Sequence, residues 1–212
     1  MGGAANPSGR RRDVSDRMPG RDVYISIDVE ADGPVPIAYS MTSLGMCVAG
    51  TYDGSRYERR DPSADTFYRE LRPISERWDP EALAVGGFTR EALLAEGADP
   101  AVAIPQAVGW IERVSDGMKP VLVAYPLTFD AAYWHAYAVL YNDGADPFGH
   151  ATHLDMKTMY QTKARSLMSR STKHSMPRHL VDSRFQHTHH ALDDAMGQAE
   201  LFSNLVAWDG CT

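Results

Sequence analysis

The architecture of this chain is set by Tyr24-Ile25-Ser26-Ile27-Asp28-Val29-Glu30, an apolar strand pattern that contains two carboxylates. Alternate residues of a strand point to the same face, so Asp28 and Glu30 project together. Ile25 and Ile27 then occupy the opposite, apolar face. Carboxylates that face a crevice at the end of a strand can hold a hard cation through oxygen. The alternative is a solvent-facing pair at a strand edge, and the Asp-x-Glu pattern alone does not decide between the two.

The rest of the chain shows strand patterns first and then helix patterns. Further strands are expected at residues 37–48, 56–60, 66–71 and 120–125, with a turn at 50–54. Helices are expected to begin at Asp79 and Thr89, and to cover 104–114, 128–141 and 190–208. The run at 120–125 is continuously apolar, as in a strand covered on both faces. This order predicts an α/β fold in which a mixed β-sheet is flanked by α-helices.

The length of 212 residues suits one compact domain that buries a proper core. That domain is expected over residues 21–212. Residues 1–20, which include Arg10-Arg11-Arg12, have no hydrophobic periodicity and are expected to form a disordered basic tail.

The C-terminal helix pattern begins with His189-His190-Ala191-Leu192-Asp193-Asp194-Ala195. With a period of 3.6 residues, Asp194 shares a stripe with Gln198 and several apolar residues, so it is expected to face the core. Asp193 belongs to a polar stripe and is expected to be a solvated charge in the first turn. Five positions separate His189 from Asp194. Both can therefore face one site only if His189 lies on the loop that enters the helix.

Asp130 follows a buried strand pattern and opens a helix, a position where α/β proteins often place functional groups. The alternative is an ordinary acidic first-turn residue beside a Thr128 cap. For Asp155 a strand-to-helix cap is favoured over a metal role. For His187 and His190 exposed positions near the helix cap are favoured, and the aromatic residues of the helices are interpreted as core.

The overall charge limits the class of protein. A formal net charge of −7 argues against general, charge-driven binding to nucleic acid, which needs a cationic surface. It does not exclude an enzyme whose acidic metal ligands contribute to that charge. No apolar run approaches the roughly 20 residues that span a bilayer, and no signal-peptide core is present, so no membrane partner is expected. Cys47 and Cys211 lie far apart, which favours a reducing cytoplasm.

The segment 157–184 is basic, and Asp182 is its only acidic residue. By itself the segment favours a solvated loop or helix face. Beside an acidic metal site, a surface for a phosphate backbone becomes the better interpretation. The candidate nucleic-acid contacts are Lys163, Arg165, Lys173 and Arg178.

With Asp28-x-Glu30, Asp130 and His189-x4-Asp194 in this order, the chain resembles the DEDDh family of 3′–5′ exonucleases. Members include oligoribonuclease, ribonuclease T and the proofreading subunit of bacterial DNA polymerase III. The resemblance covers residues 22–208, and the His-x-Ala-x-x-Asp-Ala pattern is its most specific element. Two departures bear on substrate choice. Many relatives have Thr-Gly where this chain has Ala31-Asp32-Gly33, and His-Asn where it has Tyr125-Pro126.

The resemblance implies an RNase H-like fold and a two-metal mechanism. It implies that Asp28, Glu30 and Asp194 hold one Mg2+ or Mn2+ ion, that Asp28 bridges to a second, and that Asp130 supports the second. His189 would accept the proton of the attacking water. The product would be a nucleoside 5′-monophosphate released from the 3′ end.

Short or single-stranded RNA is the expected substrate, from the similarity to small stand-alone bacterial members, some of which act on RNA. The alternative within nucleases is DNA, as for a proofreading or repair enzyme. A non-catalytic RNA-binding protein on the same fold is less favoured, because all five ligand and base positions are filled. Several small relatives are homodimers, so a homodimer is expected.

Overall fold

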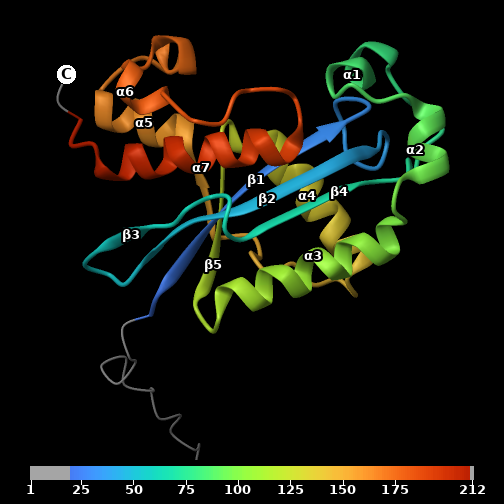
Figure 1. The fold of residues 1–212 in the computed structure, drawn as a ribbon, viewed down its shortest axis with the longest axis horizontal. Helices are drawn as coiled ribbons and strands as arrows, with labels where there is room; N and C mark the ends of the chain where they lie inside the picture. The colour runs from blue at the N-terminus through green and yellow to red at the C-terminus, as the bar shows by residue number, and fades with distance from the viewer. Residues whose placement is uncertain (1–19, 211–212) are drawn as a thin grey trace, which may run out of the picture.

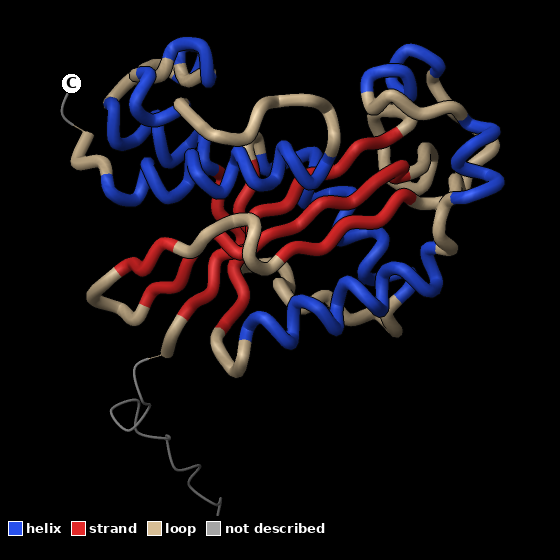
Figure 2. Tube along the Cα trace, viewed as in Figure 1, coloured by secondary structure: helices blue, strands red, loops and turns tan. Residues whose placement is uncertain are grey.

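The computed structural model of the chain describes residues 20–210, and in that range a mixed β-sheet lies between two layers of helices (Figures 1 and 2). The central strand β1 (Asp22–Ala31) runs antiparallel to β2 (Met41–Tyr52) and parallel to β5 (Lys119–Ala124). The outer strands are β3 (Tyr57–Arg59) and β4 (Thr66–Glu70), which pair with opposite ends of β2, and β6 (His153–Asp155), which runs parallel to β5. The predicted α/β fold with a mixed sheet flanked by helices is confirmed.

Helices cover both faces of this sheet. One face carries α3 (Pro100–Ser115) and α4 (Leu127–Tyr141) (Figure 1). The other face carries α5 (Met156–Ala164), α6 (Arg178–Val181) and α7 (Ala191–Ala207). Two short helices, α1 (Pro80–Val85) and α2 (Arg90–Glu96), lie beyond the end of β1. None of the helices within residues 20–210 is long and apolar enough to cross a membrane.

The strand alternation predicted for β1 directs its side chains into two separate environments. Ile25 and Ile27 are fully buried in a core shared with α3 and α4. Asp28 lies on the opposite face, where it meets Gln198 of α7. A second core on that face is built by α5 and α7 against β2 and β5. The helix residues interpreted as core are all buried: Tyr133, Trp134, Tyr137, Met196 and Phe202.

The turn expected at residues 50–54 is wrong in its first half. β2 continues to Tyr52, because residues 50–52 pair with β3. The turn begins at Asp53, whose carboxylate accepts hydrogen bonds from the backbone N–H groups of Ser55 (2.9 Å) and Arg56 (2.8 Å). The strand expected from Ile37 begins only at Met41, and Ile37 has a φ of 70°, which is incompatible with a strand.

Helix starts show how well local capping signals work. Asp79 caps α1, and Thr89, where the second helix was expected to begin, caps α2. Each accepts a hydrogen bond from a first-turn N–H. α3 begins at Pro100, with Asp99 as its cap, and not at residue 104. The Asp-Pro pair that marks this start repeats the pair used for α1, so the signal was present in the sequence.

α4 is capped from another part of the chain. Thr128 was expected to cap it, but the helix begins at Leu127, and the preceding Pro126 makes no side-chain cap bond. The carboxylate of Asp155 accepts a hydrogen bond from Leu127 N (2.8 Å) with one oxygen and from Thr158 N (2.6 Å) with the other. The predicted strand-to-helix cap at Asp155 is therefore confirmed, and it serves α4 as well as α5.

For two parts of the chain, prediction and structure cannot be compared in full. For the strand β6 and the helix α5 only the junction at Asp155 was predicted, and no prediction covered the helix α6 or two short 3-10 turns, Met168–Arg170 and Lys173–Ser175. The predicted basic tail at residues 1–20 lies outside the described residues apart from Gly20.

Candidate active site

Carboxylates from the two ends of the chain meet at the end of β1. Asp28 and Glu30 project from β1, and Asp194 projects from the first turn of α7. One carboxylate oxygen from each of the three lies within 4.8 Å of the others. The helix can come so close because Gly45 of β2 lies beneath it: a Cβ at this position would be 2.3 Å from the backbone of Ala191. The absence of a side chain at residue 45 thus brings Asp194 within reach of β1.

Asp130 joins this group from the other side of β1. It lies in the first turn of α4, is 5% exposed, and accepts a hydrogen bond from Val29 N at 3.0 Å. Asp130 is therefore an acidic residue in the first turn of a helix, and it also lies near Asp28. Its charge reaches the other carboxylates, because it contributes to the raised pKa values of Asp28 and Glu30.

Three carboxyl groups of this cluster, those of Asp28, Glu30 and Asp130, have raised pKa values. Burial raises the pKa of Asp28 well above its usual range, and the three neighbouring carboxylates raise it further, against the opposing charge of Lys173. Burial, then Asp194 and Asp130, raises the pKa of Glu30 to about 7. Burial also raises the pKa of Asp130 to about 7, although the N–H of Val29 opposes it. A bound cation would relieve this repulsion.

Asp194 faces the core and Asp193 faces outward, as the helix period predicts. The Asp194 side chain is 2% exposed, whereas that of Asp193 is 43% exposed. The Asp194 carboxylate accepts hydrogen bonds from Thr188 N and His189 N, both at 3.1 Å. Two successive backbone N–H groups thus fix the loop before α7 to the carboxylate.

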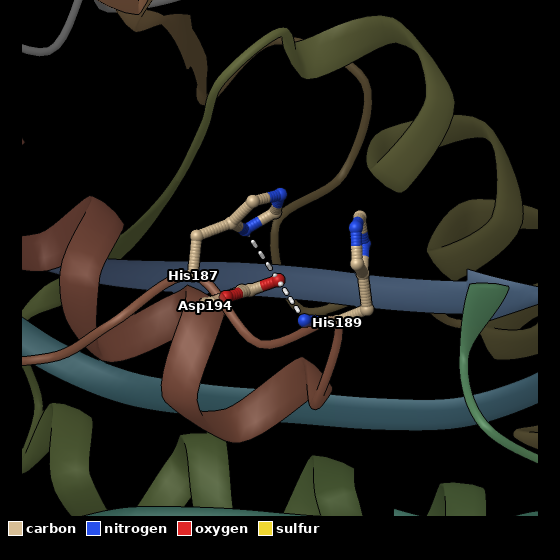
Figure 3. A group of neighbouring side chains, drawn as sticks. All are labelled: His187, His189 and Asp194. Carbon is tan, nitrogen blue, oxygen red and sulfur yellow. Dashed lines mark hydrogen bonds and ion pairs between the residues drawn. The ribbon is translucent and has the colours of Figure 1, made fainter.

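His189 lies on this loop, as its spacing from Asp194 requires. Its φ of 58° is left-handed, and α7 begins two residues later at Ala191. The imidazole stands beside the Asp194 carboxylate (Figure 3). Its ligand nitrogen, one from His187 and an Asp194 oxygen all lie within 4.8 Å of one another.

His187 has a closer link to the site than the sequence indicated. It is 63% exposed, as expected, but its Nδ1 lies 2.8 Å from Asp194 Oδ2 (Figure 3). The rings of His187 and His189 are 4.4 Å apart between centroids. His190 behaves as expected near the cap: it occupies the N-cap position of α7 and stacks on Tyr68.

Gln198 is a site residue whose role the sequence did not reveal. Its Nε2 donates a hydrogen bond to Asp28 Oδ1 (2.6 Å), and its Oε1 accepts one from Tyr125 N (2.7 Å). The residue therefore links the end of β5 to a carboxylate of β1. The available signal was its position four residues after Asp194, on the same buried stripe of α7.

The four basic residues proposed as nucleic-acid contacts have different surroundings. Lys173 lies near the carboxylates, over the ring of Tyr125 at 5.3 Å, and lowers the pKa of Asp28 and Asp130. Lys163 donates hydrogen bonds to the carbonyls of Leu205, Val206 and Trp208 at the end of α7. Arg165 lies at the C-cap of α5 and Arg178 in α6. Contact with nucleic acid stays a prediction for all four.

The donor set fits a divalent metal ion. Asp28, Glu30 and Asp194 offer only carboxylate oxygens, the ligands that hard cations such as Mg2+ and Mn2+ prefer. Three carboxylates raise the pKa of Asp28, whereas Lys173 lowers it. This excess of negative charge is expected of a site built around a cation.

Comparisons with known proteins agree with this geometry. No model of a protein family matches the chain. It is 37% identical to the 3′–5′ DNA exonuclease Cap18 of Escherichia coli over 183 residues, which make up 86% of this chain and 90% of that protein.

Solved structures share the fold at low sequence identity. The nuclease domain of 3′hExo, a DEDDh family member solved with bound rAMP, superposes with a TM-score of 0.63 at 15% identity, over 91% of this chain and 94% of that one. Pop2p of S. pombe, solved in a form with bound Mg2+ and Mn2+, gives a TM-score of 0.57 at 14% identity, over 89% and 85%.

Proposed function

The chain belongs to the DEDDh family of 3′–5′ exonucleases, and we propose that it releases nucleoside 5′-monophosphates from the 3′ ends of short single strands. The observation that carries this proposal is the meeting of Asp28, Glu30 and Asp194 within 4.8 Å, with Asp130 beside them. Four acidic groups gathered in a partly buried place would destabilise a protein that did not bind cations there.

In this proposal Asp28, Glu30 and Asp194 hold one Mg2+ or Mn2+ ion, and Asp28 and Asp130 hold a second. A pair of such ions stabilises the attacking and leaving oxygens of a phosphodiester displacement. Gln198 orients Asp28 through the 2.6 Å hydrogen bond to its Oδ1. The N–H groups of Thr188 and His189 orient Asp194 in the same way.

His189 is the proposed proton acceptor for the attacking water. An imidazole suits this role because it exchanges a proton near neutral pH. The backbone of the loop is held to Asp194, so the ring of His189 lies next to this carboxylate.

Two polymers are candidates for the strand. Short RNA is the first, as the similarity to small bacterial family members implies. Single-stranded DNA is the second, and the 37% identity to a DNA exonuclease supports it as an alternative without placing it ahead of RNA. The two differ at the 2′-hydroxyl, a group that a protein must contact to tell RNA from DNA.

The test is degradation of matched 5′-labelled RNA and DNA oligonucleotides with Mg2+, with Mn2+ and with EDTA. We expect a metal-dependent ladder that shortens from the 3′ end. Asp194→Ala should lower the rate by more than about 100-fold. It removes a proposed metal ligand itself, whereas loss of a residue that only hydrogen-bonds to a ligand typically costs about 10–100-fold. Asp193→Ala is the matched control and should keep most of the rate, since its side chain is directed outward.

Each result has a direct meaning. Shortening of RNA alone establishes an exoribonuclease, and faster shortening of DNA assigns the DNA alternative. Equal losses in the two aspartate variants would contradict the assignment of Asp194. If neither polymer is shortened although metal binds, the non-catalytic interpretation replaces this proposal.

A further inference from the structure

Two neighbouring imidazoles lie close to one carboxylate at the entrance to α7, in addition to the group formed by the three carboxylates. His187, His189 and Asp194 each offer a ligand atom within 4.8 Å of the other two. Figure 3 shows the two rings next to each other, with the Asp194 carboxylate beside the His187 ring, and the ring centroids are 4.4 Å apart. Both histidines are exposed, so their rings can turn without repacking a core.

The loop geometry explains why the rings converge. The backbone N–H groups of Thr188 and His189 both donate to Asp194, which wraps residues 187–189 around this carboxylate. His187 Nδ1 already lies 2.8 Å from Asp194 Oδ2. The arrangement therefore rests on three separate contacts to the same side chain.

The chemistry of this group differs from that of the neighbouring carboxylates. Two nitrogens and one oxygen suit Zn2+ or Co2+, whereas Mg2+ prefers oxygen ligands alone. We propose that His187, His189 and Asp194 form a transition-metal site that takes Zn2+ or Co2+, with water as the fourth ligand. Tetrahedral bonds of about 2.0–2.2 Å place ligand atoms roughly 3.3–3.6 Å apart. The present spacings allow this after small rotations of the two exposed rings.

This site shares Asp194 with the carboxylate group and contains His189. A metal ion bound to the two histidines therefore occupies the imidazole of His189, the proposed proton acceptor. It also neutralises part of the charge of Asp194, which both sites share. Zn2+ is expected to inhibit hydrolysis that Mg2+ or Mn2+ supports. The inhibition rests on the proposed function, whereas binding of the ion to the histidines does not.

Binding is measured first, by visible absorption and equilibrium dialysis with Co2+. The Glu30→Gln variant is used, because it weakens the carboxylate group and leaves the two imidazoles. We expect it to bind one Co2+ with the absorption of a low-coordinate ion. Adding His187→Gln should weaken that binding by at least about tenfold, since a ligand is lost. Adding His179→Gln, an exposed histidine of α6, is the matched control and should leave binding unchanged.

Inhibition is measured second, in chains that keep Glu30. Wild type, His187→Gln and His179→Gln are titrated with Zn2+ at fixed Mg2+, and each rate is divided by that variant's own rate without Zn2+. We expect the Zn2+ concentration for half inhibition to rise at least about tenfold in His187→Gln only.

The outcomes distinguish the transition-metal site from the proposed exonuclease function. Co2+ binding that is indifferent to His187 overturns the transition-metal site. Co2+ binding that requires His187, in a protein that hydrolyses nothing, supports this site and contradicts the proposed function. Zn2+ inhibition that is equal in wild type and His187→Gln overturns the link between this site and catalysis.

Discussion

At the scale of single residues, the site is built from groups that weaken the metal-free fold. Burial raises the pKa of Asp28, and the charges around it raise it further. Each ionised carboxylate that the fold brings there adds to the repulsion. The features that suit the site to a cation are therefore unfavourable for stability in the absence of one.

Asp28→Asn is expected to raise the melting temperature in EDTA. The amide removes a buried charge, and its oxygen can still accept the hydrogen bond from Gln198. Each kcal/mol gained should raise Tm by roughly 2–4 °C in a chain of this size. The same variant should lose the Tm increase that Mg2+ gives the wild type, because a ligand is missing. Differential scanning calorimetry with and without Mg2+ checks both, and a lower Tm in EDTA would contradict the prediction.

Gln198→Met is expected to weaken metal activation. Methionine fills a similar volume but cannot donate to Asp28, and it leaves Tyr125 N without its acceptor. Loss of an outer partner typically lowers metal affinity or activity by about 10–100-fold. The Mg2+ concentration that gives the half-maximal rate of hydrolysis should therefore rise, and a high Mg2+ concentration should partly restore the rate.

Ser203→Ala is the control for this variant. Ser203 is also buried on α7, but it bonds Tyr57, away from the carboxylates. If both variants lowered stability and left the Mg2+ requirement unchanged, Gln198 would have only a structural role.

The sequence revealed side-chain direction but not side-chain partners. The helix period placed Asp194 inward, and the spacing placed His189 on a loop, and both expectations are confirmed. The contacts of His187 and Gln198 depend on how the loop folds over the helix and how the helix packs on the sheet. Neither is encoded in local periodicity.

At the scale of helices and strands, most boundaries follow from local chemistry. Two Asp-Pro pairs and one Thr cap mark three helix starts. The start of α3 was missed although its Asp-Pro signal is local, whereas two other errors arose where the deciding interaction was distant in sequence. β2 is longer than expected because β3 pairs with it, and α4 is capped by Asp155 from a later strand.

Asp155→Ala is expected to destabilise two helices at once. It removes hydrogen bonds to Leu127 N and Thr158 N. A cap is worth about 0.5–2 kcal/mol, so the loss of two should cost about 1–4 kcal/mol. Asp79→Ala, which removes a single cap from α1, should cost about half as much. Urea unfolding of the two variants gives the comparison, and equal losses would show that one of the two bonds at Asp155 contributes nothing.

At the scale of the whole molecule, the predicted mixed sheet with helices on both faces is confirmed, and it brings the first strand and the last helix together. The pattern of alternating elements was sufficient for that prediction, because few packings cover both faces of a mixed sheet. The homodimer and the cytoplasmic location stay predictions.

The metal-free protein is expected to lose stability as pH rises from about 5 to 8. The pKa values of Glu30 and Asp130 are raised to about 7 in the folded chain, against about 4 when unfolded. Their favourable contribution is complete below the unfolded value and is lost as pH rises through the folded one. Tm in EDTA should therefore fall across this range.

Saturating Mg2+ should make Tm depend less on pH, because a cation favours the ionised carboxylates. Asp130→Asn is the matched control and should show a smaller fall in EDTA. A Tm that rises from pH 5 to 8 without metal would contradict the prediction.

Gln198 and Asp28, which are joined by a hydrogen bond, stand 170 positions apart along the chain. At roughly 5–20 residues per second, a ribosome needs about 10–30 seconds to add the second after the first. Until the last few residues of that interval the growing chain carries β1 but lacks Asp194. If the proposed activity is correct, the chain cannot cut the strands around the ribosome that is making it.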